Sequence, residues 1–206
     1  MVTLTGREAD GSVRSAASLV LPSGVHSAPL RIQGTSALLF YCFDEREHAR
    51  RRSAGAGSLP QIDVLEALLE LPANEPVALD GLGPAQRRTL EQALPGAVDL
   101  SGSAVIRRAV RPLSIELAVV RARATDWRRG LALAGRFASF CARALLLDGP
   151  GPDVQETLMQ ASFYGIGILL PSSDGLQMAV LPEPYRPQRH TAAAWRFAEE
   201  VYQRVT

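Results

Sequence analysis

Residues 113–147 constrain the fold more than any other stretch of the chain. Residues 113–120 form a short apolar run rich in β-branched side chains, with one acid in its middle, which is typical of a buried strand. Apolar residues then recur at spacings of three and four over residues 126–141, and this period predicts an amphipathic helix. A second apolar run follows at 144–147. Strand, helix and strand together indicate a βαβ unit, because parallel neighbours need a crossover connection.

The first 58 residues are expected to form an antiparallel β segment and a linker. The charged run at 44–52 predicts a short solvated helix, since three acids beside Arg50 to Arg52 disfavour a phosphate site. The small-residue tract at 53–58 predicts a mobile linker. We therefore expect a domain boundary there, with domains at 1–58 and 59–206. The predicted strands are 2–4, 17–21, 29–34 and 36–43.

Residues 97–182, about half of the chain, resemble the core of the PD-(D/E)XK nuclease superfamily. In that family an acid closes one strand and an E-x-K motif lies on the next. Asp99 stands where the first acid would be, and Glu116 stands where the second would be. Residues 126–131 and 161–170 are similar to segments that often follow the motif. The resemblance implies a restriction-endonuclease-like core, in which a mixed sheet is flanked by helices.

Two positions depart from the pattern of an active member. Ala118 occupies the place of the motif lysine, and Leu133 occupies a helix position that often carries Gln. The resemblance implies that in active members the two acids bind Mg²⁺ and the lysine activates water. All 22 basic residues of this chain are arginine, which does not exchange its proton near neutral pH. We therefore expect a catalytically inactive protein without a metal or other cofactor.

Residues 59–110 allow two interpretations. Both include helices at 59–71 and 84–94 and a hairpin at 98–110. In the nuclease-like interpretation the first helix packs on the sheet, and Glu66 or Glu70 is the extra acid that some members carry. In the other interpretation a short helix at 76–82 completes a winged helix-turn-helix that binds DNA. Its candidate DNA contacts are Arg87, Arg88, Arg107 and Arg108.

The C-terminal part ends in a helix with an apolar stripe. A helix at 153–164 and strands at 166–170 and 176–181 come first, and a proline-rich segment at 182–187 interrupts regular structure. The helix at 191–205 must bury its stripe in its own domain or against a second copy. Self-association through this helix is therefore one candidate interaction.

Composition limits the remaining classes of function. Hydrophobic residues make up 47% of the chain and charged residues 21%, which indicates a globular protein. The net charge of +1 gives no general attraction to nucleic acid or anionic membranes. Cys42 and Cys141 lie in apolar contexts and are predicted to be free thiols. No signal peptide pattern or membrane-length apolar run is visible, so we expect a cytoplasmic protein with no membrane contact.

Three functions remain for this α/β or α+β chain. The first is an inactive, nuclease-like accessory or scaffolding subunit that binds a protein partner, with a link to nucleic acid left open. The second is a winged-helix DNA-binding regulator. The third, which the missing lysine disfavours, is an active phosphodiesterase that uses Asp99, Glu116 and Mg²⁺.

The resemblance also predicts topology and one contact. The strands around 99–110, 113–120, 144–147 and 166–170 should lie in one sheet, with the helix at 126–141 crossing between the second and third. Because Ala118 and Leu133 are apolar, Glu116 would be buried in apolar surroundings, and a buried carboxylate requires a cation or donor. The expected partners are Arg121, Arg123 and Arg136.

Overall fold

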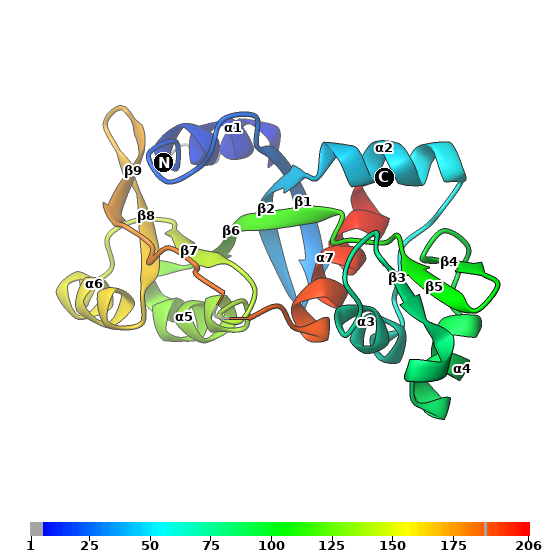
Figure 1. Cartoon of the computed structure of the whole chain (residues 1–206). Coiled ribbons are helices and arrows are strands. Elements are labelled where there is room, and N and C mark those ends of the chain that lie inside the picture. Colours follow the sequence, from blue (N-terminus) through cyan, green and yellow to red (C-terminus); the bar gives the residue numbers. More distant parts are fainter. Residues whose placement is uncertain (1–5, 188) are drawn as a thin grey trace. The chain divides into compact units, whose positions relative to one another are not determined.

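The computed structural model describes residues 6–187 and 189–206, which form a mixed α/β fold (Figure 1). The described residues contain seven α-helices, a six-stranded mixed sheet and a three-stranded antiparallel sheet, and they confirm the predicted fold class. The chain divides into two compact units. Unit 1 comprises residues 1–42 and 115–186, and unit 2 comprises residues 43–114 and 187–206. The predicted boundary at residue 58 therefore falls inside unit 2.

The six-stranded sheet belongs to unit 1. The pairings of β6 with β7 and of β7 with β8 are parallel, whereas β1 pairs with β2 and β8 pairs with β9 in antiparallel orientation. The predicted crossover helix α5 (Trp127–Gly135) connects β6 to β7, and α6 (Val154–Phe163) connects β7 to β8. In order across the sheet the strands are β1 (His26–Ile32), β2 (Thr35–Phe43), β6 (Leu113–Ala122), β7 (Ala142–Leu147), β8 (Ile166–Ser172) and β9 (Gly175–Val180).

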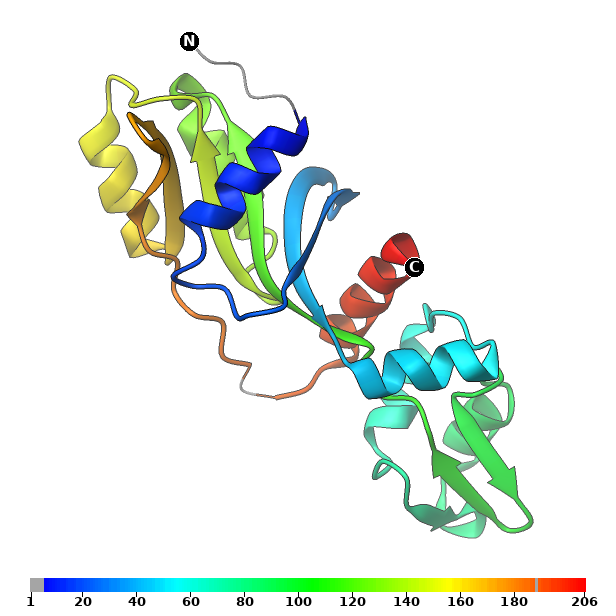
Figure 2. The ribbon, with the colours of Figure 1, turned by 90° about the horizontal axis from the view of Figure 1, so that it is seen from above.

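Helices cover both faces of this sheet. Helix α1 (Gly6–Ala16) lies on one face, and α5 and α6 lie on the other (Figures 1 and 2). Val13 of α1 is fully buried against Phe40 and Leu117 of the sheet. On the opposite face Gly130 lets α5 approach closely, because a Cβ atom there would lie 2.7 Å from a methyl carbon of Leu145. The βαβ unit predicted from residues 113–147 is thus confirmed.

The N-terminal segment is only partly as predicted. The β1–β2 hairpin confirms the two strands expected at 29–34 and 36–43, and Gln33 and Gly34 form its tight turn with positive φ angles of 52° and 70°. Residues 17–21, expected as a strand, instead form turns that follow α1. This expectation was wrong because Ala17 bonds back to the last turn of α1 and is fully buried, whereas Leu19 is 85% exposed, so the segment lacks the alternating burial of a strand. The strand expected at 2–4 lies outside the described residues.

Unit 2 is built from helices around the small sheet. Its core cluster includes Leu65, Leu68, Leu90 and Trp195, which are almost completely buried. The small sheet has the order β3-β5-β4. The elements of the unit are α2 (Glu45–Ala54), α3 (Ile62–Leu69), β3 (Pro76–Ala78), the 3₁₀-helix η1 (Leu79–Gly81), α4 (Pro84–Glu91), β4 (Val98–Ser101), β5 (Ala104–Arg107) and α7 (Ala192–Val205).

Two expectations about this unit need correction or refinement. The hairpin β4–β5 was expected to extend the large sheet, but it pairs with β3 in the small one. The apolar stripe of α7, including Ala198 and Val201, is buried in the folded chain. Self-association through that stripe would require it to be uncovered first.

Among the described residues, no helix has both the length and the apolarity that a membrane span requires.

Candidate functional site

The two acids of the nuclease-like motif lie in different sheets. Glu116 is on β6 in unit 1, whereas Asp99 is on β4 in unit 2, where its carboxylate accepts from Arg108 Nε at 2.6 Å. Glu116 is the only carboxylate on the six strands of the large sheet. No group of three or more potential metal-binding side chains occurs within the described ranges. The structure therefore does not place a second strand acid beside Glu116 in its own sheet.

Glu116 and the two positions that depart from the motif differ in burial. Ala118, which occupies the lysine position, is fully buried, while Glu116 itself and Leu133 are only half-buried. Burial, the largest effect, raises the pKa of the Cys141 thiol to about 12, and the charge of Glu116 adds to that rise. Arg136 donates to the backbone oxygen of Gln33 at 3.0 Å. An ion pair of Glu116 with Arg121, Arg123 or Arg136 stays a prediction.

Unit 2 contains the elements that the winged-helix interpretation requires. Helix α3, the short helix η1, helix α4 and the β4–β5 hairpin follow one another in that order, and β5 lies between β3 and β4. The short helix expected at 76–82 is reduced to one 3₁₀ turn after β3. Glu66 lies exposed on α3, and Glu70 is exposed at the C-cap of that helix. Neither acid is part of the large sheet.

The four arginines proposed to contact DNA have different environments. Arg87 and Arg88 are exposed on α4, although Arg87 pairs with Glu91 at 2.8 Å. Arg107 instead points into the unit, where it donates to the backbone oxygens of Leu68, Leu71 and Ala109.

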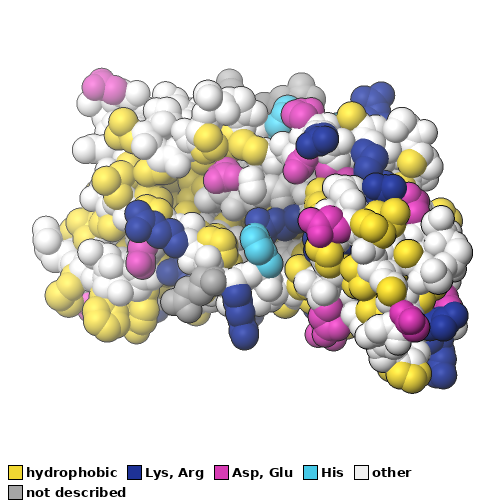
Figure 3. All heavy atoms as spheres, in the orientation of Figure 1, with side chains coloured by type: hydrophobic (Ala, Val, Ile, Leu, Met, Phe, Trp, Pro, Cys, Tyr) yellow, Lys and Arg dark blue, Asp and Glu magenta, His cyan; other side chains and the backbone are white. Residues whose placement is uncertain are grey.

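The surface of unit 2 does not have the charge of a typical DNA-binding face. Acidic and basic side chains lie beside one another over the region of α4 and the β4–β5 hairpin on the face that Figure 3 shows. Arg108 is partly neutralised by Asp99, and Arg87 by Glu91. A uniformly basic patch is the usual electrostatic footprint of a DNA-binding surface. Of the four arginines, only Arg88 is exposed and forms no ion pair with a described residue.

A buried ion network holds α2 and α7 together in unit 2, and the sequence did not predict it. Arg51, in the run expected to be solvated, is only 1% exposed, and so is Glu199 of α7. Arg51 Nη1 and Nη2 each donate to Glu199 at 2.7 Å, and Arg51 Nε donates to Glu47 at 2.7 Å. Two features of the sequence could have indicated this network. Glu47 and Arg51 have i,i+4 spacing, and a lone acid lies in the apolar stripe of α7.

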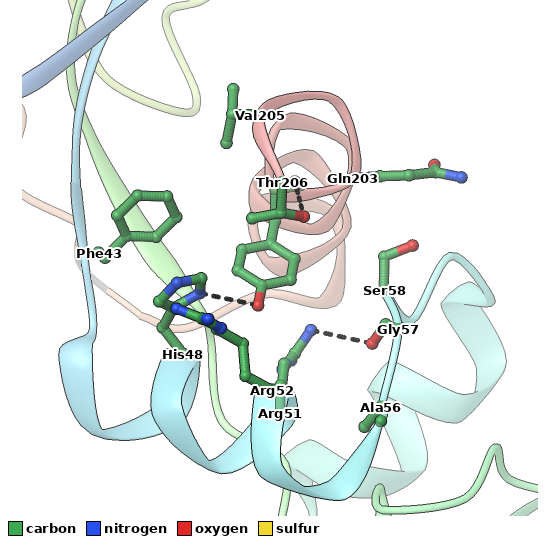
Figure 4. Close-up of a pocket in the computed structure, with 12 residues that line it drawn as sticks. Phe43, His48, Arg51, Arg52, Ala56, Gly57, Ser58, Gln203, Val205 and Thr206 are labelled. Carbon is green, nitrogen blue, oxygen red and sulfur yellow. Dashed lines mark hydrogen bonds between the residues drawn. The ribbon is translucent and has the colours of Figure 1, made fainter.

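A cavity of about 740 Å³ lies next to this network in unit 2 (Figure 4). His48 Nδ1 is 3.0 Å from the hydroxyl of Tyr202, and the ring of Phe43 stacks on the imidazole at 4.6 Å. Burial is the main cause that raises the pKa of Tyr202. The lining side chains include no carboxylate and no thiol. His48 and Tyr202 interact with each other, and Ser58 and Thr206 add two further hydroxyl groups to the lining.

A second cavity, of about 470 Å³, lies between α5 and α6 of unit 1. Its walls are largely apolar and include Leu131, Ala132 and Ile166, while Arg128 and Arg143 also line it. On α6 the neighbouring Met159 and Phe163 are 65% and 82% exposed, and Tyr164 follows them at 54%. Of these three side chains only Tyr164 lines this apolar groove, but large apolar side chains this exposed are typical of an interaction surface.

No protein-family model matches this chain, and neither the curated proteins nor the solved structures include a significant match to it.

Proposed function

We propose that the chain is a cytoplasmic, catalytically inactive accessory protein that acts through protein–protein contacts. The observation that carries this proposal is that Glu116 is the only carboxylate on the large sheet. Metal-dependent phosphodiester hydrolysis requires a metal held by several oxygen ligands, and positive charge near the developing negative charge. The nuclease-like core would thus be retained as a scaffold.

The position of the missing lysine supports the same conclusion. Ala118 is fully buried between its neighbours on β6. A metal ion and its water molecules require polar, partly hydrated surroundings, because an uncompensated charge in an apolar site is costly. Arginine could supply charge but not the exchangeable proton of a lysine. A relationship to the PD-(D/E)XK superfamily, if it holds, would be that of a degenerate member.

The apolar groove between α5 and α6 is the surface we assign to the partner. Met159, Phe163 and Tyr164 would contact the apolar face of a partner helix, as in helix-in-groove recognition. The small side chains of Ala132 and Ala138 leave space for a helix to approach. Arg128 and Arg143 favour a partner whose helix carries acidic residues beside its apolar face.

A cleavage assay tests the catalytic part of this proposal. Plasmid and single-stranded DNA should stay intact when incubated with the purified protein and Mg²⁺ or Mn²⁺. Cleavage that disappears in the Glu116→Ala variant would contradict the proposal and support an active phosphodiesterase.

Site-specific crosslinking tests the interaction part. A photoreactive benzoyl-phenylalanine in place of Phe163 should give one discrete protein adduct in the native cells, because that position is 82% exposed in the groove region. The same probe in place of Arg87, which is exposed on α4 of unit 2, is the matched control. Failure to form a discrete adduct at 163, or identical adducts at both positions, would count against the groove.

The second candidate function is a winged-helix DNA-binding regulator. It is favoured by the element order of unit 2 and by the exposed Arg87 and Arg88 on α4. Fluorescence anisotropy with duplex DNA tests it, because replacing both arginines by alanine should weaken binding and reduce its salt dependence. Binding that is unchanged in this variant would exclude α4 as the DNA contact.

A further inference from the structure

A second basic cluster in unit 2 is not used by any of these functions. It surrounds a cavity of about 450 Å³ at the start of α7, which we call the arginine pocket. Three arginines and one histidine line this cavity, together with a single acid and the ring of Trp195. The charged and titratable residues are Asp44, Arg107, Arg111, Arg189 and His190. All of them belong to unit 2.

None of the three arginines of this pocket forms an ion pair with an acid of the described residues. Arg111 and Arg189 make no hydrogen bond or ion pair with another residue of the described ranges. Arg107 donates only to backbone oxygens, and its guanidinium lies 4.9 Å from the ring centre of Trp195. Burial, the largest effect, lowers the pKa of Arg107, although the charge of Glu47 acts in the opposite direction. An anion in the pocket would supply the missing negative charge.

The only acid in the pocket has a structural role that accounts for its presence. Asp44 is the N-cap of α2, and its Oδ1 accepts from the backbone N–H of Glu47 at 2.9 Å. Its charge opposes an anion, but three arginines outnumber it. The first turn of the 14-residue helix α7 also lines the cavity through Thr191 and Ala194. The positive end of the helix dipole therefore adds to the attraction for anions.

The size and the walls of the pocket indicate more than an inorganic ion. A volume of about 450 Å³ lies within the range of small-molecule sites. Leu69, Val110 and Ala194 form an apolar part of its lining. Guanidinium groups match the geometry of phosphate oxygens and can bind them with two parallel hydrogen bonds. We propose that the arginine pocket binds a small organic phosphate ester, with its phosphate at Arg111 and Arg189 and its organic part against the apolar part of the lining.

Calorimetric titration tests this proposal with ribose 5-phosphate as the probe. The sugar phosphate should bind more tightly than inorganic phosphate, and ribose should not bind detectably. Arg111→Ala and Arg189→Ala should each weaken binding about tenfold, as expected when one charge-assisted hydrogen-bonding group is lost. Arg196→Ala is the matched control, because Arg196 is an exposed arginine of α7 that does not line the pocket. Its affinity should equal that of the wild type.

A variant with the opposite effect sharpens the test. Asp44→Asn keeps a side-chain oxygen for the cap of α2 and removes the opposing charge, so the affinity for ribose 5-phosphate should rise a few-fold. Equal affinity for ribose 5-phosphate and sulfate would overturn the proposal. So would equal losses in Arg111→Ala and Arg196→Ala, or undetectable binding to the folded wild type. None of these outcomes depends on whether the protein cleaves DNA or binds a protein partner.

Discussion

The two arginine clusters of unit 2 differ in how completely their charge is compensated. Arg51 is 1% exposed and has an acceptor for each of its five N–H groups, three on carboxylates and two on the backbone oxygens of Gly57 and Val110. Arg111 and Arg189 line an open cavity and have no acid partner among the described residues. A guanidinium with every donor satisfied inside the protein can only support the fold. One that is left unsatisfied at a cavity can bind a ligand.

The buried cluster is more than a single ion pair. Glu199 also accepts from the backbone N–H of Leu59 at 2.9 Å and from Trp195 Nε1 at 2.8 Å. Glu47 accepts two hydrogen bonds from Arg50 at 2.7 and 2.8 Å. The network therefore connects α2, α7 and the segment before α3 through fully paired groups. Such networks are costly to break, because each removed partner leaves another buried group unsatisfied.

The largest effect is expected from removing the centre of this network. Arg51→Met should lower the free energy of unfolding by about 3–5 kcal/mol, because Glu199 would remain buried without a cation. Urea denaturation measures this loss. Arg52→Met changes the adjacent, exposed arginine and should stay within about 0.5 kcal/mol of the wild type. If the two variants are equally stable, the network does not stabilise unit 2.

A smaller loss is expected at the one pocket arginine that also supports the fold. Arg107 lines the arginine pocket, but it also donates to the backbone oxygens of Leu68 and Leu71 at the end of α3. Arg107→Met should therefore cost about 1–3 kcal/mol in stability, through lost bonds to helix carbonyls and to Trp195. The same denaturation measurement applies. A loss as large as that of Arg51→Met would remove the distinction between the two clusters.

Acid should weaken the buried cluster in a predictable direction. Burial alone would raise the pKa of Glu47, but hydrogen bonds and charge from Arg50 and Arg51 outweigh it and lower the pKa below its usual value. The resulting stability is present above the unfolded pKa of about 4.3 and is lost as the pH falls through the folded value. Glu47→Gln should flatten this acid-side dependence when unfolding is measured from pH 7 downwards. An unchanged pH profile would show that Glu47 is not charge-stabilised.

The sequence revealed the elements whose pattern is local. The β6–α5–β7 unit followed from apolar runs and a helical period within residues 113–147. The β4–β5 hairpin was also recognised, but a hairpin pattern does not specify which sheet it joins, so Asp99 was assigned to the wrong one. Helix α1 was missed because its sequence, rich in glycine, serine and charge, is not typical of a helix.

The two arginine clusters were beyond sequence analysis for a different reason. Arg51 lies 148 residues from Glu199 in the chain, and a run of charged residues normally indicates a solvated surface. Arg107 and Arg189 of the pocket belong to β5 and to the segment before α7. Only tertiary structure brings such positions together. Arg107 was assigned to a DNA-binding wing because its hydrogen bonds to α3 leave no trace in the sequence.

The smallest effect on stability is expected at Arg111 and Arg189, where the expected loss of ligand binding is largest. Arg111 and Arg189 make no hydrogen bond or ion pair with another described residue. Arg111→Ala and Arg189→Ala should therefore change the free energy of unfolding by no more than about 0.5 kcal/mol. Removing unpaired positive charge beside Arg107 could even stabilise the empty protein slightly, because like charges repel. Added ribose 5-phosphate should raise the melting temperature of the wild type more than that of either variant. Destabilisation of the unliganded variants by more than about 1 kcal/mol would instead assign these arginines to the fold, as for Arg51.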